Sequence, residues 1–295
     1  WQPSLFETES PKFDRKKTKV RGKIFILDHD TNQKERIDHE DLEWDYLAGD
    51  GDVRSDEVKS LRDGADVIVT NPPFSLFREF LAWIVEADKK FLIIGNMNAI
   101  TYKEVFPRIK QNLIWMGATG NGSDMVFAVP EGAEVRESDR AKAARLGYVG
   151  CFTRLGNSCW FTNIEHGRRH QLLQLMTERE NIKFSKHKEI RGTGYRRYDN
   201  YDAIEVPFTD AIPSDYEGVM GVPKSFLDKY CPEQFEIVGC AEGDSGKELG
   251  LKPFDRALKK LNPSLRDGRL YYFEDGAPVK PYARILIRHR KGFSK

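Results

Sequence analysis

Short apolar runs alternate with amphipathic stretches along the first part of the chain. The runs predict strands at 23–27 (KIFIL), 43–47 (EWDYL), 67–69 (VIV), 91–95 (FLIIG) and 125–129 (MVFAV). Between the third and fourth runs, apolar residues recur at i, i+4 and i+8, which predicts a core-facing helix capped by Ser75. Thr101 and Glu104 form a capping-box pattern for a further helix. This strand-helix-strand order favours an α/β fold with a parallel, doubly wound sheet.

Beyond residue 165 the sequence becomes basic, polar and rich in turns, and we place a domain boundary there. The second part, 166–295, predicts a helix at 223–230 and several short strands. A hairpin is indicated by strands at 271–273 and 283–287 with an Asp275-Gly276 turn. Residues 1–22 lack periodicity, which predicts a loose arm.

The sequence Asn71-Pro72-Pro73-Phe74 follows directly on residues 66–70 (DVIVT), whose run at 67–69 predicts a buried parallel strand. Two prolines force an extended, rigid turn where that strand ends. Ligands of open α/β sheets bind at the carboxyl ends of strands, so this turn is the main candidate site. The plain alternative is a strand-terminating turn with a core phenylalanine.

The chemistry of this turn suits an exocyclic amino group. The amino nitrogen of adenine is a poor nucleophile because its lone pair is delocalised into the ring. The Asn71 side-chain carbonyl can accept one amino hydrogen and the Pro72 backbone carbonyl the other, which localises that pair. Pro73 would fix the geometry, and Phe74 would stack on a base flipped out of a duplex.

Longer blocks of the sequence resemble the family of EcoRI-type adenine-N6 DNA methyltransferases. The resemblance covers most of residues 45–295. Its blocks are 49–117, 157–163 (NSCWFTN), 198–204 (YDNYDAI), 215–223 (DYEGVMGVP), 232–237 (PEQFEI) and 281–287 (PYARILI).

The resemblance implies a Rossmann-like methyltransferase sheet in a catalytic domain at 1–165. It implies a C-terminal α+β target-recognition region for DNA at 166–295. The methyl donor would be S-adenosylmethionine and the substrate an adenine in double-stranded DNA. The catalytic motif carried over is Asn71, Pro72, Pro73 and Phe74.

A second candidate site is the sequence Gly49-Asp50-Gly51-Asp52. Glycines let a backbone approach a ligand closely, and a carboxylate accepts from an adenine amino group or a ribose hydroxyl. The alternative is a polar turn before a helix capped by Ser55. The resemblance favours the adenosine end of the donor, so the predicted donor-binding residues are Asp50, Gly51, Asp52 and Asn71.

One departure from the family concerns the start of the chain. Family members carry, before the matched region, an N-terminal segment that supplies the first strands and part of the donor pocket. This sequence begins at Trp1 without a glycine-rich turn after an early strand. We therefore expect either a longer protein or an incomplete donor site.

Composition is that of an ordinary soluble protein, with 39% hydrophobic and 32% charged residues. No run has the length of a membrane span and the sequence contains no charged-then-apolar leader, which predicts a cytoplasmic protein without a membrane partner. The resemblance implies a bacterial or phage-encoded enzyme. The four cysteines form no C-x-x-C pair and are expected to be reduced.

No metal is expected. A calcium-loop pattern starts at Asp30, but Lys34 occupies a ligand position and Glu35 the position that requires a glycine. A monomer is favoured.

The net charge is only +1, but its distribution is uneven. Residues 166–198 hold nine Lys and Arg against three acidic residues, and the last fifteen residues hold five against none. Such runs are either solvated faces or phosphate-contacting surfaces, and the adenine-directed turn favours the latter. The DNA-binding candidates are Arg168, Arg169, Arg191, Arg196, Arg197 and Asn200.

We therefore predict a site-specific adenine-N6 DNA methyltransferase of the restriction-modification or epigenetic type, which flips its target base. A first alternative is methylation of RNA or of a protein glutamine, since N-P-P followed by an aromatic residue also occurs there. A second is a DNA-binding relative with impaired catalysis. Donor-binding calorimetry distinguishes the last of these from an enzyme.

Overall fold

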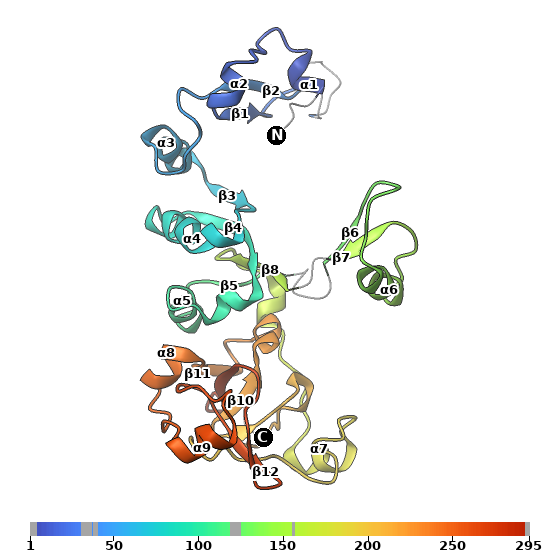
Figure 1. The fold of residues 1–295 in the computed structure, drawn as a ribbon, viewed down its shortest axis with the longest axis vertical. Helices are drawn as coiled ribbons and strands as arrows, with labels where there is room; N and C mark the ends of the chain where they lie inside the picture. Colours follow the sequence, from blue (N-terminus) through green and yellow to red (C-terminus); the bar gives the residue numbers. More distant parts are fainter. Residues whose placement is uncertain (1–4, 31–36, 38–40, 119–124, 155–156, 293–295) are drawn as a thin grey trace. The chain divides into compact units, whose positions relative to one another are not determined.

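The computed structural model describes residues 5–30, 37, 41–118, 125–154 and 157–292 (Figure 1). The chain forms two compact units. The first comprises Trp1–Ile68 and Ile84–Lys89, and the second comprises Val69–Trp83 and Lys90–Lys295. The functional boundary at residue 165 lies inside the second unit and stays a prediction.

The first unit is built on a two-stranded antiparallel sheet. Its elements are α1 (Leu5–Thr8), α2 (Lys17–Val20), β1 (Lys23–Ile26), β2 (Glu43–Tyr46) and α3 (Asp56–Gly64). Both strands were predicted. The prediction of a loose arm over 1–22 is wrong, because the buried Glu7 of α1 forms an ion pair with Lys23 of β1.

The Asn71 turn belongs to a four-stranded sheet with the order β3-β4-β8-β5. The strands are β3 (Val67–Thr70), β4 (Lys90–Asn96), β5 (Trp115–Met116) and β8 (Ser158–Thr162). β8 runs antiparallel to both β4 and β5, so the prediction of a wholly parallel sheet is wrong. The mixed α/β arrangement is nevertheless consistent with a methyltransferase fold.

The strand before Asn71 is less buried than its sequence predicts. Val67 and Val69 are exposed, because β3 is the edge strand and its alternation places both on one face. Burial is instead concentrated on β4 and β8, where Phe91, Ile93 and Phe161 are fully buried. The prediction of a buried strand at 67–69 is therefore wrong, whereas the strand predicted at 91–95 is confirmed as part of the buried β4.

Helices follow both β3 and β4. They are η2 (Phe74–Leu76, a 3₁₀ helix), α4 (Phe77–Glu86), η3 (Met97–Thr101, 3₁₀) and α5 (Phe106–Lys110). The helix predicted between the strands at 67–69 and 91–95 is confirmed as α4. Ser75 lies inside η2 and therefore does not cap α4. The predicted capping box is also wrong, since Thr101 ends η3 and its hydroxyl donates to the Asn98 carbonyl.

An excursion between β5 and β8 forms a small antiparallel pair with one helix. Its elements are β6 (Val126–Ala128), α6 (Glu137–Arg145) and β7 (Phe152–Arg154). The strand predicted at 125–129 is therefore confirmed.

A second four-stranded sheet, with the order β11-β14-β10-β9, forms the core of the C-terminal part (Figure 1). Its strands are β9 (Ile204–Glu205), β10 (Met220–Pro223), β11 (Phe235–Ala241) and β14 (Arg284–His289). The surrounding helices are η5 (Gly167–His170), α7 (Glu178–Phe184), η6 (Thr209–Ala211), η7 (Lys224–Lys229), α8 (Gly243–Glu248) and α9 (Arg256–Leu261). The helix predicted at 223–230 is η7, a 3₁₀ helix.

The predicted hairpin is half right. β12 (Tyr272–Glu274) turns through Asp275 and Gly276, which have φ of 49° and 78°, as expected for this dipeptide. Its partner is β13 (Ala277–Val279) and not the strand at 283–287. That strand is β14, whose buried Ile285, Leu286 and Ile287 lie between β11 and β10.

Candidate active site and nucleic-acid surface

The turn after β3 leaves its two predicted acceptors unused. Asn71 is exposed, and its side-chain amide makes no hydrogen bond to another described residue. The Pro72 carbonyl likewise accepts none from the described residues, whereas the Pro73 carbonyl accepts from the Leu76 amide at 2.8 Å to close η2. The turn is therefore closed through Pro73, while the Asn71 and Pro72 oxygens accept no hydrogen bond from the described residues; Asn71 is exposed and Pro72 is buried.

Two phenylalanines three residues apart have opposite environments. Phe77 is only 1% exposed and packs against Phe161, with ring centroids 5.0 Å apart, so it anchors α4 on the sheet. Phe74 is 41% exposed. The alternative of a core phenylalanine at position 74 is thus contradicted, and Phe77 takes that role.

A chain of polar side chains lies at the carboxyl end of β4. Asn96 Oδ1 accepts from the Asn98 amide at 2.8 Å and from Asn157 Nδ2 at 3.4 Å. Asn98 Oδ1 in turn accepts from Lys224 Nζ at 2.8 Å, across 126 positions of sequence. Burial lowers the pKa of Lys224. Sequence reasoning missed Lys224, because nothing local marks a lysine after β10.

The Gly49–Asp52 turn lies in the first unit and is described there by itself. Its backbone is held by Glu57 of α3, which accepts from the Ala48 and Gly49 amides at 2.8 and 3.0 Å. Asp52 pairs with Arg54, whose side-chain hydrogen bond lowers the Asp52 pKa. Asp50 Oδ1 accepts from the Asp52 amide, and Gly51 has a φ of 84°.

The plain alternative for this turn is also present in the structure. The Ser55 hydroxyl accepts from the Val58 amide and caps α3 as predicted. The turn is therefore well formed without a ligand. The second Asp50 oxygen remains available to a ligand, while Asp52 is committed to Arg54 and the Gly49 carbonyl accepts from the Gly22 amide at 2.9 Å.

The arginines at the start of the basic segment differ in environment. Arg168 donates to the Ala118 carbonyl at 2.6 Å and pairs with Asp228. Arg169 is buried: it donates to Glu165 at 2.5 Å and Asn112 at 2.8 Å and lies 4.0 Å from the Trp115 ring centroid. Arg169 therefore joins β5 to η5, a structural role.

The candidates further along are likewise of two kinds. Arg191 is exposed and forms no ion pair within the described ranges, whereas Arg196 pairs with Glu274 at 2.5 Å and Arg197 with Asp202 at 2.8 Å. Asn200 is buried, and its amide donates to two carbonyls and accepts from the Tyr271 amide. Asn200 thus holds three segments together.

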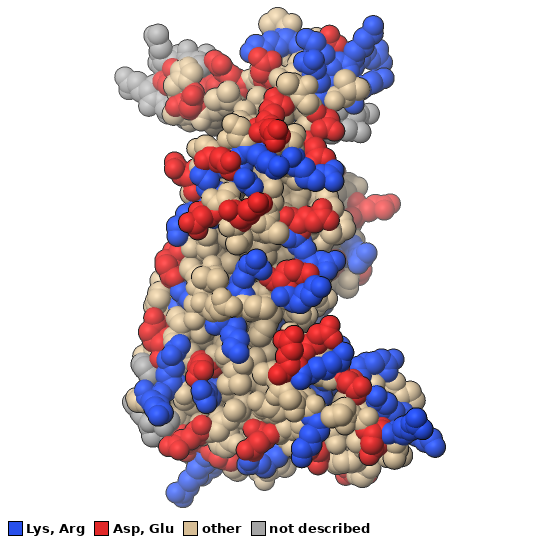
Figure 2. Space-filling model, turned by 90° about the vertical axis from the view of Figure 1, so that its left-hand side faces the viewer, with Lys and Arg blue, Asp and Glu red and all other residues tan. Residues whose placement is uncertain are grey.

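The C-terminal basic residues do not form one free surface. Arg284 is buried and makes a two-nitrogen contact with Glu205, whose carboxylate also accepts from the Tyr198 hydroxyl. Arg288 pairs with Glu236 at 2.9 Å. Figure 2 shows basic and acidic side chains interleaved over the face that it presents. The prediction of a phosphate-contacting tail therefore fails at Arg284.

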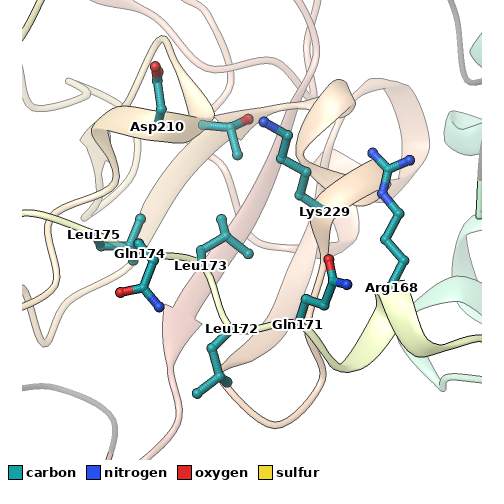
Figure 3. A pocket seen from close by; sticks show the side chains of 9 residues that line it. Arg168, Gln171, Leu172, Leu173, Gln174, Leu175, Asp210 and Lys229 are labelled. Atoms are coloured by element: carbon teal, nitrogen blue, oxygen red, sulfur yellow. The ribbon is translucent and has the colours of Figure 1, made fainter.

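A groove of about 350 Å³ lies beside Arg168. It is lined by the extended segment after η5, with its leucines and glutamines, and by Lys229 of η7 (Figure 3). Figure 3 shows the side chains of Lys229 and Arg168 on the same side of this groove. Sequence reasoning missed the groove because residues 171–176 have neither a periodic pattern nor a motif.

Other predicted features have simple outcomes. All four cysteines are free, and burial raises the pKa of Cys159 to about 12. Among the described residues, no three His, Cys, Asp or Glu side chains are grouped so that they could hold a metal ion. In the same part of the chain, no helix has the length and apolarity needed to cross a membrane. The glycine-rich stretch 117–123 (GATGNGS) and the calcium-loop pattern that starts at Asp30 lie largely outside the described residues.

Unused acceptors at a strand end suit a transferase acting on an amino nitrogen, and the mixed α/β fold is consistent with a methyltransferase. The family described as adenine-specific methyltransferase EcoRI matches residues 3–290. The chain therefore belongs to this family of adenine-specific methyltransferases. No solved structure matches it.

Three relatives are similar over much of the chain. The Type II methyltransferase M.EcoRI of Escherichia coli is 41% identical over 80% of this chain and 70% of its own length. Two Mycoplasma type II methyltransferases, M.MgeORF184P of M. genitalium and M.MpnI of M. pneumoniae, are 37% and 34% identical over 66% of this chain. The matches span 58% and 57% of the lengths of these two relatives.

Proposed function

We propose that this protein transfers a methyl group from S-adenosylmethionine to the N6 nitrogen of an adenine in double-stranded DNA, as a site-specific enzyme of type II restriction-modification. Family membership supports the adenine-directed reaction. The observation that carries the catalytic assignment is the pair of unused acceptors on Asn71 and Pro72 beside an exposed Phe74.

The proposed chemistry of the turn follows from these acceptors. Asn71 Oδ1 and the Pro72 carbonyl oxygen each accept one hydrogen of the amino group, which concentrates the lone pair on nitrogen as it becomes a nucleophile. Phe74 stacks on the flipped adenine, and its exposed ring is available for this contact. Bound S-adenosylmethionine supplies an electrophilic methyl group.

For donor binding, the proposal favours Asp50 and the Gly51 backbone over Asp52. Asp50 has a carboxylate oxygen that is not used within the turn, which fits a ribose hydroxyl or an adenine amino group. Asp52 would have to leave Arg54 first. Asn71 is a second proposed donor contact.

For DNA contact, the proposal assigns different roles to the candidate residues. Arg168, Arg191, Arg196 and Arg197 retain exposed side-chain surface for phosphates or bases, whereas Arg169 and Asn200 act through the packing of the recognition region. Target recognition by residues 166–295, a monomeric state and a cytoplasmic location remain predictions.

The test uses the full chain, S-adenosylmethionine with a labelled methyl group, and three substrates: duplex DNA, RNA and a glutamine-containing peptide. The expected product is N6-methyladenine in DNA alone, identified by mass spectrometry. Label on RNA or glutamine would replace the proposed substrate. Absence of both donor binding by calorimetry and methyl transfer would instead favour the DNA-binding relative with impaired catalysis.

A further inference from the structure

The hairpin of β12 and β13 has the form of a narrow two-stranded ribbon. The registered pairs are Tyr272 with Val279, Phe273 with Pro278 and Glu274 with Ala277, and the Asp275-Gly276 turn closes its tip. The partner strand thus contributes small side chains near the tip. A two-stranded ribbon of this kind fits the major groove of B-DNA, where base edges are read.

Arg196 and Glu274 form an ion pair at this ribbon, so a hydrogen-bond donor and an acceptor lie next to each other. The Arg196 guanidinium donates to Glu274 Oε1 at 2.5 Å and lies 5.1 Å from the Tyr272 ring centroid. Tyr272 and Glu274 are two residues apart on β12 and share a face, so the ring lies beside the ion pair. The guanidinium is therefore held in one orientation by a charge and an aromatic ring.

Both side chains nevertheless keep a surface for a ligand. Arg196 and Glu274 side chains are 45% and 41% exposed. Glu274 Oε2 has no hydrogen bond to another described residue, and several guanidinium N–H groups stay available. A cavity of about 330 Å³ adjoins the pair and is also lined by Tyr272, Tyr282 and Arg284. Tyr282 is 88% exposed at its edge.

We propose that the Arg196–Glu274 pair reads one G·C base pair of the recognition sequence from the major groove. Arginine donates to guanine O6 and N7, while a carboxylate accepts from the cytosine N4 amino group. Guanine O6 and N7 and cytosine N4 lie side by side on the major-groove edge of a G·C pair. Their arrangement matches an arginine and a glutamate that already form an ion pair. The inference rests on the proposed function, because it requires DNA as the substrate.

The chain offers a matched control for an ordinary surface ion pair. Arg288 pairs with Glu236 at 2.9 Å, and their side chains are 51% and 43% exposed, close to the values of the proposed pair. The Arg288 pair lies between neighbouring strands of the C-terminal sheet and not on the ribbon. Exposure and ion pairing are thus alike in the two pairs, which differ in their position and in the Tyr272 ring beside Arg196.

The experiment selects bound duplexes from a random DNA pool with the full chain, and then measures affinities for the consensus and its single-pair variants. We expect a consensus with at least one G·C pair. Arg196→Gln should reduce discrimination at that pair by about 10- to 100-fold and leave the other positions unchanged. Arg196→Lys should lose most of the same discrimination while keeping affinity for non-specific DNA, since lysine lacks the two-nitrogen fork.

A base analogue and two further variants test whether the loss of discrimination arises from contact with the guanine. Replacing the guanine by 7-deazaguanine, which lacks N7, should weaken binding by the parent chain but not by the Arg196→Gln variant. Glu274→Gln should affect the same base pair, and Arg288→Gln should affect none. Thermal melting of each variant verifies that it is folded.

Several outcomes would overturn the inference. A consensus without G·C, an equal loss at all sequences, or an unchanged selection would each leave the pair as a phosphate contact or a surface ion pair. Selection measures binding and not methyl transfer. A chain that selects a G·C-containing site but transfers no methyl group would therefore contradict the proposed function and keep this inference.

Discussion

Asn71 and Asn200 were both predicted from sequence as functional asparagines, and their burial and hydrogen bonding in the structure are opposite. Asn71 ends an edge strand with its amide exposed and without a hydrogen bond to the described residues. Asn200 is buried and uses both ends of its amide on the Lys252, Arg269 and Tyr271 backbone. A polar side chain kept for a substrate leaves its hydrogen-bonding groups open, whereas one kept for the fold has them satisfied.

The largest expected effect comes from Asn71→Ala. The methyl-transfer rate in a single turnover should fall at least ~10²-fold, the scale for removing one acceptor that acts in the transition state. The free energy of unfolding should stay nearly unchanged, because the side chain contacts little of the protein. An undiminished rate would remove the catalytic assignment.

Asn200→Ala should show the reverse pattern. It removes three hydrogen bonds and leaves the buried Tyr271 amide without its acceptor, so the free energy of unfolding should fall by about 2–4 kcal/mol. Methyl transfer per folded molecule should change little. Denaturant titration and active-site titration measure the two quantities, and a large rate loss at unchanged stability would return Asn200 to the DNA-contacting residues.

What sequence could predict follows from the range of the interactions involved. The Asn71 turn, the α4 helix and the Asp275-Gly276 turn depend on prolines, apolar spacing and positive φ, all of which are local. The burial of β3 was overestimated because a sheet edge is defined by distant strands. The same limit misassigned β14: its apolar run is typical of a central strand, and its partners lie on β10 and β11.

The site residues divide in the same way. Phe74 and Phe77 both belong to an apolar pattern, and only the packing of Phe77 on Phe161 distinguishes them. The sequence does not distinguish Arg169 from Arg191, since both belong to the basic segment. Only Arg169 contacts Glu165, Asn112 and the Trp115 ring. Lys224 and Glu274 carry no motif, because their partners lie 126 and 78 positions away.

A smaller effect is expected from Phe74→Ala, which compares the exposed Phe74 with the buried Phe77. If the exposed ring stacks on the flipped adenine, the extruded state should lose about 1–3 kcal/mol, and Phe74→Tyr or Phe74→Trp should retain most of it. Fluorescence of 2-aminopurine at the target position reports flipping. Phe77→Ala is the matched control, since it should lower stability. Full flipping by a folded Phe74→Ala variant would leave Phe74 without this role.

The smallest expected effect compares Arg191 with Arg169. The logarithm of DNA affinity should fall linearly with the logarithm of salt concentration, and Arg191→Gln should reduce the steepness of this line by roughly 0.9 if its exposed guanidinium neutralises a phosphate. Arg169→Gln should leave the slope unchanged and lower stability instead, because its partners are Glu165, Asn112 and the Trp115 ring. Both substitutions remove one positive charge, so net charge alone would change the two slopes equally. Equal slopes would therefore show that the salt dependence arises from overall charge, and that the exposed arginine is solvated surface.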